Sequence, residues 1–517
     1  MGDTAHNHQQ PPPAMVAAPP PSSLAFSKGP SWSPSETLQS LEYCIHSNPS
    51  WPQTFLLAFQ HYIVMLGTTV LITRTLVNQM GGDPGDAARV IQTLLFMSGI
   101  NTLLQTFIGT RLPTVMGPSY AFVLPVLSII RDYNDETFSK EHDRFVAIMR
   151  TIQGSLIVSS FVNIILGYSK GWGTLTRLLS PITVVPVVCV VGLGLFMRGF
   201  PLLANCVELG LPMLILLVIC QYSKNLHSSA RPLLERYGLL FCGGIIWAFA
   251  AILTVAGAYN NVGYRTKQSC RTDRSYLISS SPWVRVPYPF QWGAPIFRAS
   301  HVFGMIGAAL VSSAEGVGLL LDGIFGAAVG STASVENVGL LGHTYIGSRR
   351  AVQVSTGFMF FFSIFGKFGG LFASIPLAIF AAAYCVLYGI VAAIGISFIQ
   401  FSNNNSMRNH YVLGLALFLG ISIPQYFVSN TTGDGHGPIR ADGGWFNDIL
   451  NTVFSSPPAV AMIVGTLLDN LLEARNNIND RGIPWWKPFQ NRKGDSRSAE
   501  FYGMPIRINE WMPTRYL

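Results

Sequence analysis

Long runs of apolar residues dominate the chain, and polar residues gather in the short segments between them. A run of about 20 residues predicts a membrane-spanning helix, because a helix of that length crosses the hydrocarbon core of a bilayer. The pattern therefore predicts an all-α polytopic membrane protein. The runs lie at residues 54–72, 90–110, 147–167, 182–197, 201–221, 238–257, 352–374, 376–398, 411–428 and 457–472.

Two further apolar segments contain residues that interrupt helices. The segment 113–130 holds three prolines and Gly117, and the stretch SVENVGLLGHT at 334–344 is short and rich in glycine. Irregular backbone persists at membrane depth only where protein buries it or where it lines a cavity. One broken segment in each half of the chain is typical of a transporter built from inverted repeats, with its binding site at the breaks. The alternative interpretation is that both segments are kinked structural helices.

Composition agrees with a membrane protein. Hydrophobic residues make up 49% of the 517 residues and charged residues 11%, whereas soluble domains carry about 25% charged residues. The net charge of +8 does not indicate a nucleic-acid partner, because membrane proteins place excess Lys and Arg in cytoplasmic loops. We find no phosphate-binding glycine loop, metal-ligand cluster or nucleophile motif, so we predict no enzyme activity, metal or cofactor. We interpret the seven cysteines as packing residues.

The placement of basic residues predicts the topology. Basic connectors include Arg111, the segment 224–236 and the pair Arg349-Arg350, and placing them in the cytoplasm puts both termini there. The acidic connector 131–144 and the glycosylation sequon at Asn430 then lie outside. We expect a multi-pass protein of the plasma membrane. Its parts are a disordered Pro-rich N-tail without a signal peptide (1–40), a transmembrane domain (41–475) and a cytoplasmic C-tail (476–517).

Four motifs resemble the nucleobase–ascorbate transporter family, and the resemblance covers residues 40 to 490 approximately. The segment Glu336-Asn337-x-Gly339-x4-Thr344 matches the family signature. The other matches are Gln60-His61 to the pair in the first span, Gly117 to Ala121 to the broken third span, and SSAE, ending at Glu315, to the eighth-span stretch whose glutamate binds substrate. The stretches NSMRN at 405–409 and PYPFQWG at 287–293 are similar to plant members.

The resemblance implies fourteen segments in two inverted seven-segment repeats. A core domain (about 54–167 and 299–374) would carry the substrate and move as an elevator against a gate domain (about 182–257 and 376–472), which would form a homodimer. The implied function is proton-coupled symport of purine or pyrimidine bases such as xanthine, uric acid, adenine or uracil. Alternatives are a transport-impaired splice isoform that acts as a dimerising regulatory subunit, an ascorbate transporter, and an anion-exchanger relative. Glu rather than Pro at position 336 favours the nucleobase branch.

The chemistry of the candidate residues suits a planar heterocycle edged with N–H donors and C=O acceptors. A carboxylate accepts N–H bonds, an amide donates to a carbonyl, and an aromatic face stacks on the ring. Carboxylates inside a membrane are costly and therefore candidates for function. For Asn337, packing between half-helices is an equal alternative, and we expect Asp322 to be structural. We predict substrate contacts from Glu315, Glu336, Asn337, Ser119 and Tyr120, with positioning or coupling roles for Gln60, His61 and Thr344.

Two features depart from the family pattern. The signature ends in Tyr345, where the family has Arg, Lys or Gly. In addition, SSAE runs directly into GVGLLLDGIFG, where the family has more helix and a polar connector. The apolar run 301–330 would be about 45 Å long as one helix, against a ~30 Å hydrocarbon core, so two full spans do not fit. We expect two short half-spans broken at Glu315-Gly316, because a single span would invert the topology of everything that follows.

Overall fold

The computed structural model describes residues 42–482, apart from five single positions and seven short segments. These are 44, 46, 135, 374 and 404, and 170–178, 223–230, 273–281, 313–314, 432–436, 442–443 and 473–480. The predicted N-tail and almost all of the predicted C-tail lie outside the described residues.

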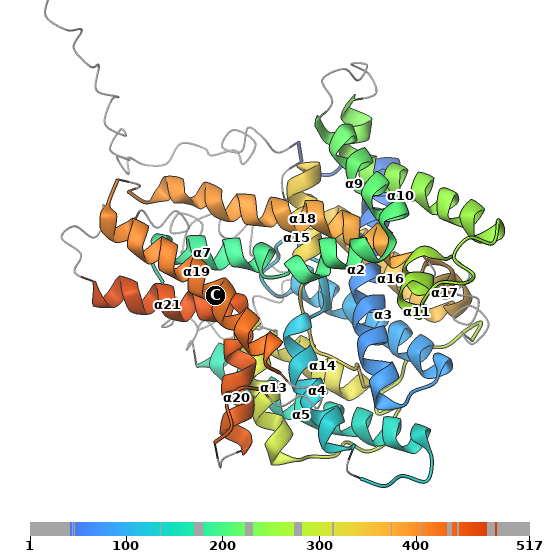
Figure 1. Cartoon of the computed structure of the whole chain (residues 1–517), viewed down its shortest axis with the longest axis horizontal. Coiled ribbons are helices and arrows are strands. Elements are labelled where there is room, and N and C mark those ends of the chain that lie inside the picture. Colours follow the sequence, from blue (N-terminus) through green and yellow to red (C-terminus); the bar gives the residue numbers. More distant parts are fainter. Residues whose placement is uncertain are drawn as a thin grey trace, which may run out of the picture.

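Helices form most of the described chain (Figure 1). The first half contains α2 (Trp51–Met80), α3 (Pro84–Phe107), α4 (Val123–Asp132), α5 (Glu141–Tyr168), α7 (Pro181–Leu193), α8 (Phe200–Leu203), α9 (Val207–Tyr222), α10 (Arg231–Val255) and α11 (Tyr264–Cys270). The second half contains α13 (Ala299–Val311), α14 (Gly316–Phe325), α15 (Val335–Thr344), α16 (Arg349–Ile364), α17 (Gly366–Ala373), α18 (Leu377–Ser397), α19 (Met407–Ser429), α20 (Gly444–Phe454) and α21 (Pro457–Leu471). Short 3-10 turns are η1 (Tyr120–Phe122), η2 (Phe196–Arg198), η3 (Ala204–Cys206) and η4 (Phe398–Phe401).

The all-α polytopic fold is confirmed. Seven helical segments among the described residues are long and apolar enough to cross a membrane, and the bent pair α20–α21 adds an eighth. Each predicted apolar run coincides with a helix or a pair of helices. The sequence pattern missed α20, which meets α21 at 88°.

Local sequence sets the tight turn between the first two spans. Gly81 ends α2 in the left-handed conformation, at φ 84°, which glycine adopts without a steric penalty. Asp83 then caps α3, since its side chain accepts from the backbone N–H of Asp86 and Asp86 bonds back to Asp83. Pro84 fills the first helical position, where its missing N–H costs nothing. The chain therefore reverses within three residues.

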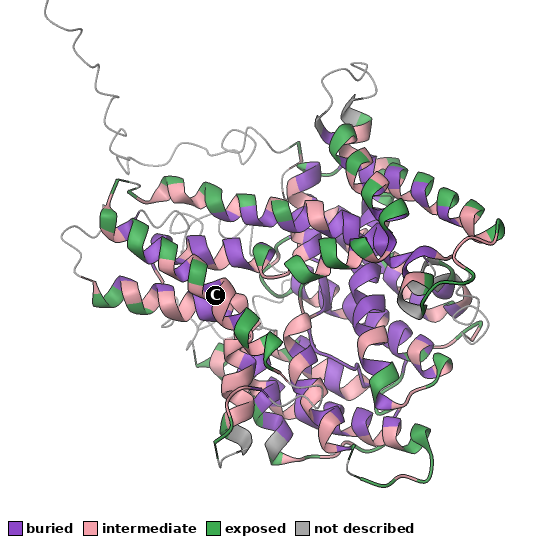
Figure 2. Ribbon diagram, viewed as in Figure 1, coloured by how far each residue is buried: buried purple, intermediate pink, exposed green. Residues whose placement is uncertain are grey.

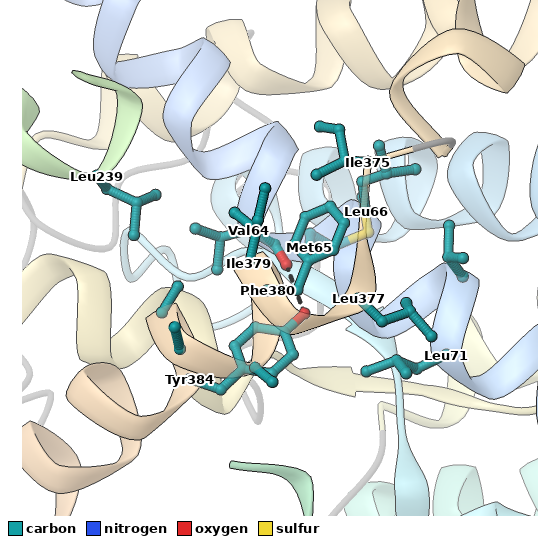
Figure 3. Packing of buried hydrophobic residues seen from close by; sticks show 14 of the residues in the cluster. Val64, Met65, Leu66, Leu71, Leu239, Ile375, Leu377, Ile379, Phe380 and Tyr384 are labelled. Carbon is teal, nitrogen blue, oxygen red and sulfur yellow. Dashed lines mark hydrogen bonds between the residues drawn. The ribbon is translucent and has the colours of Figure 1, made fainter. Parts of the chain in front are cut away.

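Two clusters of buried apolar side chains share α2. One joins α2 to α9, α10, α15, α16 and α18, and the other joins α2 to α3, α4, α5, α13 and α14. Figure 3 shows the contact between α2 and α18, where Phe380 and Tyr384 lie against Val64 and Met65. Exposed apolar residues such as Ile215, Ile245 and Phe418 lie on α9, α10 and α19 (Figure 2), as expected of helices that face lipid.

Both predicted breaks are present, and they meet each other. Strand β1 (Met116–Pro118) precedes η1 and α4, and strand β2 (Ser331–Ala333) precedes α15. The two strands pair antiparallel, with Met116 opposite Ala333. The backbone N–H of Ser119 adds a bond of 3.1 Å to the carbonyl of Gly330. Two half-helices therefore begin at one small sheet, which satisfies the backbone groups that each break exposes.

The shortened region forms a helical hairpin, as predicted. Helix α13 ends at Val311 and α14 starts at Gly316, so each is about 20 Å long or less. The end of α13 accepts a hydrogen bond from Asn163 of α5. Helix α14 then returns along α5, because Gly316 packs against Ile164 and Gly323 against Ile157. The turn between α13 and α14 lies about one helical turn before α5 ends, and the two helices run in opposite directions along α5.

Basic connectors gather at one end of the molecule. The guanidinium of Arg349 donates to the carbonyl of Arg111 at 2.8 Å, and Arg350 lies over the ring of Trp51 at the start of α2. The other end of α2 lies about 45 Å away beside the acidic connector, where Arg144 donates to the carbonyl of Gln79. The two kinds of connector therefore lie at opposite ends of α2.

The interpretation of all cysteines as packing residues is wrong for one pair. Cys206 in η3 and Cys270 in α11 form a disulfide with a Cα–Cα distance of 5.5 Å. Their separation of 64 residues carried no sequence signal. With Glu208, these two cysteines are the one group with metal-ligand spacing in the described part of the chain, but their sulfurs are bonded to each other.

Candidate functional site

The polar centre of the molecule lies where β2 becomes α15. Ser334 caps α15, since its hydroxyl oxygen accepts from the backbone N–H of Asn337. The same hydroxyl donates to Glu336 Oε2 at 2.6 Å. Serine at the helix start therefore satisfies a free backbone donor and also orients the first carboxylate of the helix.

Glu336 is held by three hydroxyl groups and is 4% exposed. Its Oε1 atom accepts from Thr68 of α2 and from Tyr388 of α18, at 3.2 Å for the tyrosine, while Oε2 accepts from Ser334. A carboxylate offers about four acceptor positions, two on each oxygen. One position on Oε2 is left for a further donor.

Asn337 joins α15 to α2. Its Oδ1 atom lies 2.8 Å from Nδ1 of His61, and its Nδ2 group donates to Ser334 Oγ at 3.0 Å. Because the amide oxygen can only accept, His61 carries its proton on Nδ1. The packing alternative for Asn337 therefore has a structural basis, and His61 positions Asn337.

Helix α18 closes the site from the other side. The Tyr384 hydroxyl donates to the carbonyl of Val64 at 3.1 Å (Figure 3) and lies 3.0 Å from Thr68 Oγ1. Tyr384 and Tyr388 stack with ring centroids 5.4 Å apart. Sequence reasoning missed Thr68, Ser334 and both tyrosines. The available signals were the hydroxyl seven residues after His61 and the Tyr-x-x-x-Tyr spacing within an apolar run.

Two predicted site residues have buried polar atoms without partners. Neither amide atom of Gln60 has a hydrogen-bond partner in the described part of the chain, although the side chain is fully buried. The Tyr120 hydroxyl is also buried and unpartnered among these residues. Such groups cost about 1–3 kcal/mol each when left unsatisfied. They are the atoms that a polar ligand would satisfy.

Glycines allow the helices of the site to approach closely. A Cβ on Gly339 would lie 2.5 Å from the carbonyl oxygen of Leu387, so α15 touches the backbone of α18. A Cβ on Gly67 of α2 would overlap the Tyr384 hydroxyl. Both positions need glycine because no side chain fits between the elements.

Known proteins match this chain along its length. Residues 52–321 and 311–429 match the model described as the Permease family. Nucleobase-ascorbate transporter 3 of Arabidopsis thaliana is 66% identical, with all of both chains covered. Nucleobase-ascorbate transporter 2 of the same organism is 51% identical over 93% of this chain and 98% of the relative.

The chain belongs to the nucleobase–ascorbate transporter family of permeases. It is therefore an integral multi-pass membrane transporter and not an enzyme.

The comparison with the family also locates the shortening. The alignment with the first relative spans 551 positions against 517 residues in this chain, so at least 34 positions are gaps here. The two matched segments overlap at 311–321, which is where α13 gives way to α14. Residues missing at the hairpin explain both observations.

Two predicted site residues lie away from this centre: Glu315, which was predicted to contact the substrate, and Thr344, which was predicted to have a positioning or coupling role. Glu315 stands at the hairpin turn, with its carboxylate beside Gly109 after the end of α3. Thr344 donates to the carbonyl of Leu340 within its own helix, about 12 Å along α15 from Glu336. The structure does not bring either side chain into the hydrogen bonds around Glu336.

The remaining predicted residues shape the breaks. Ser119 accepts from the backbone N–H of Ala121 and so caps η1. Asp322 accepts from Asn101 at 3.1 Å and from the backbone N–H of Ser331 at 2.7 Å. These bonds tie α14 to α3 and β2, which is the arrangement expected of a structural residue.

Tyr345 replaces the usual last residue of the family signature and ends α15 in the left-handed conformation, at φ 56°. Its carbonyl accepts from the backbone N–H of Glu42, and the N–H of Gly347 donates to Tyr43. Glu42 and Tyr43 therefore lie across the end of α15. Glu42 also contacts α10 through its ion pair with Arg236.

Proposed function

We propose that this permease is a proton-coupled symporter of purine and pyrimidine bases such as xanthine, uric acid, adenine or uracil. The observation that supports this most is the geometry of Glu336. Three hydroxyl groups orient its carboxylate at the point where two half-helices meet, and one acceptor position stays free. An N–H edge of a base suits that position, and the ring of Tyr120, which follows the strand paired with β2, would offer a stacking face at the same break.

The carboxylate also favours neutral bases such as xanthine, adenine or uracil over ascorbate, whereas urate, an anion at neutral pH, gains this advantage only when Glu336 is protonated. Ascorbate is an anion at neutral pH, and a second negative charge beside Glu336 would be repelled at low dielectric. A neutral base carries no such penalty. Protonation of Glu336 would neutralise the charge that a moving core has to carry through the membrane, which gives proton coupling a physical basis.

We further propose that the core moves against the gate as an elevator in a homodimer of the plasma membrane, with both termini cytoplasmic. The bonds of Thr68 with Tyr384 and of Glu336 with Tyr388 would then join core to gate. Both bonds would have to break when the core moves. They are suited to this role because each is a single hydroxyl contact, worth about 0.5–1.5 kcal/mol net, or 1.5–3 kcal/mol where one partner is charged.

A second proposal follows from the shortened hairpin. We propose, as the alternative, that the chain is a splice isoform whose role is to dimerise with full-length members and regulate them, since its α13–α14 hairpin is shorter than two full spans. This proposal predicts membrane insertion and dimerisation without uptake.

Uptake of radiolabelled bases tests the proposed function. Cells without their own base uptake would express this chain or its Glu336→Ala variant at matched surface abundance. We expect saturable xanthine uptake that the variant lacks, that a protonophore abolishes and that excess ascorbate leaves unchanged. Inhibition by ascorbate with no effect of bases would reverse the substrate assignment. Protein that reaches the cell surface but takes up neither bases nor ascorbate would favour the proposal of a regulatory isoform.

A further inference from the structure

Arg198 brings an unassigned positive charge to the candidate site. It ends η2, between α7 and α8, and is half-buried. Its guanidinium carbon lies 4.3 Å from the centroid of the Tyr120 ring, a distance typical of a cation–π contact. The contact joins the predicted gate domain to the broken segment of the predicted core.

The neighbours of η2 place Arg198 at the depth of Glu336. A Cβ on the adjacent Gly199 would lie 3.0 Å from Cys385 Sγ, next to Tyr384. Seven residues before Gly199, Gly192 packs against the carbonyl of Tyr388. Turn η2 therefore lies alongside the part of α18 whose hydroxyls bond to Thr68 and Glu336, and Arg198 is not at an aqueous end of its span.

The charge of Arg198 has no ion-pair partner among the described residues. A cation at membrane depth is costly and usually marks a functional site. Tyr120 lies two residues after β1, and Glu336 lies three residues after β2, the strand that pairs with β1. The break therefore brings together Arg198, which lies on the Tyr120 ring and only donates hydrogen bonds, and Glu336, which only accepts them.

We infer that Arg198 is a specificity-determining residue of this site. It belongs to the predicted gate domain and donates a hydrogen bond to a carbonyl oxygen of a planar substrate that stacks on Tyr120. The inference rests on the proposed function and narrows it. A guanidinium has five N–H donors and no acceptor, whereas a carboxylate is an acceptor. Together they match a lactam, in which an N–H lies beside a C=O. Xanthine, uric acid and uracil have this edge, whereas adenine has an exocyclic amine and no carbonyl group.

The pair also predicts discrimination against adenine, which narrows the set of bases proposed above. An amine facing Arg198 would place donor against donor and leave both groups unpaired. Sites built around such buried polar groups reject the wrong edge far more strongly than apolar pockets reject a change of size. Entry of the base would replace the contact between Arg198 and Tyr120 with a ring lying between or beside them.

The test compares Arg198→Gln with Met197→Gln, which introduces the same side chain at the exposed neighbouring position. Binding of xanthine, uric acid and adenine to each purified protein would be measured by thermal stabilisation. We expect Arg198→Gln to weaken the binding of xanthine and of uric acid at least about tenfold, as for loss of a charge-assisted hydrogen bond. The affinity for adenine should change less than the affinity for xanthine. Arg198→Lys should recover part of the lost affinity, and Met197→Gln should bind all three bases like the unsubstituted protein.

Unchanged xanthine affinity in Arg198→Gln would overturn the assignment, and so would an equal loss for xanthine and adenine, which would indicate a structural role. If no base stabilises the unsubstituted protein, the proposed function itself fails. Binding by the unsubstituted protein with no change of selectivity would reject the role of Arg198 alone.

Discussion

Nδ1 of His61 and Oδ1 of Asn337 lie 2.8 Å apart, although 276 residues separate them in the chain. The Gln60-His61 pair of the first span and the family signature that starts at Glu336 are thus in direct contact. Because Asn337 also bonds to Ser334, His61 is linked through two side chains to the carboxylate of Glu336. Through this relay, removal of His61 would disturb the orientation of Glu336 without a direct contact between the two side chains.

We expect His61→Ala and Asn337→Ala each to lower thermal stability and base affinity, because each leaves a buried polar partner unpaired at a cost of about 1–3 kcal/mol. The double variant should lose less than the sum of the two, with a coupling of about 0.5–3 kcal/mol. Thermal unfolding and binding of the three variants measure this coupling. Additive losses would show that the two residues act independently.

Glu336→Gln should weaken xanthine binding at least about tenfold. The new NH2 group faces hydroxyl donors or the N–H edge of the base, and each mispaired buried group costs about 1–3 kcal/mol. Tyr388→Phe removes one of the three hydroxyls and should weaken binding by a smaller factor. Competition uptake at matched surface abundance gives both values. Full affinity in Glu336→Gln would leave this residue with a structural role only.

Gly339→Ala should displace α15 from α18, since its Cβ would lie 2.5 Å from the Leu387 carbonyl. Overlap with backbone cannot be relieved by a rotamer change, and overpacking typically costs about 1–3 kcal/mol. Gly389→Ala is the matched control, because a Cβ there meets no atom within 4 Å. Detergent-solubilised thermal midpoints should fall for Gly339→Ala alone. Equal midpoints would mean that α15 and α18 pack less closely than the structure shows.

Cys206→Ser and Cys270→Ser should each lower the thermal midpoint, since disulfides typically stabilise by about 2–4 kcal/mol. Cys189→Ser, at a buried free cysteine, is the control for loss of a thiol. In intact cells, a membrane-impermeant maleimide should label Cys206 and Cys270 only after reduction, if this end of the protein faces the oxidising exterior. Labelling without reduction would show that the disulfide does not form.

Lengthening the hairpin tests its effect on transport. Inserting the corresponding segment of a family member after Glu315 should raise surface abundance and uptake, because α13 and α14 would then each cross the full ~30 Å core. An inserted glycine–serine segment of equal length controls for spacing. Equal, robust uptake with and without the family segment would show that the short hairpin suffices.

The spans could be predicted from sequence because lipid imposes one strong constraint, a continuous apolar helix. Prolines and Gly117 marked the first break, and the Glu-Asn pair within a glycine-rich stretch marked the second. Glu336 and Asn337 could be singled out because polar groups at membrane depth are rare.

Other parts depended on long-range geometry that no local pattern carries. In the sequence, Tyr384 and Tyr388 are ordinary members of an apolar helix, and only the fold brings them to the hydrogen bonds around Glu336. Arg198 was not among the candidates from sequence, because nothing in its neighbourhood shows that η2 lies against Tyr120. Glu315 was assigned by resemblance, yet the shortening of its own hairpin places it at a turn.

The pairing of β1 with β2 has a consequence for the order of events during synthesis. Ala333 leaves the ribosome 217 residues after its partner Met116, which is about 10 to 40 s at 5–20 residues per second. Throughout that interval the first break lies in the membrane without β2 and α15. The edge of β1 and the polar side chain of His61 then lack the partners that those elements supply. Biogenesis must therefore shelter an unfinished polar centre within the bilayer until the second repeat arrives.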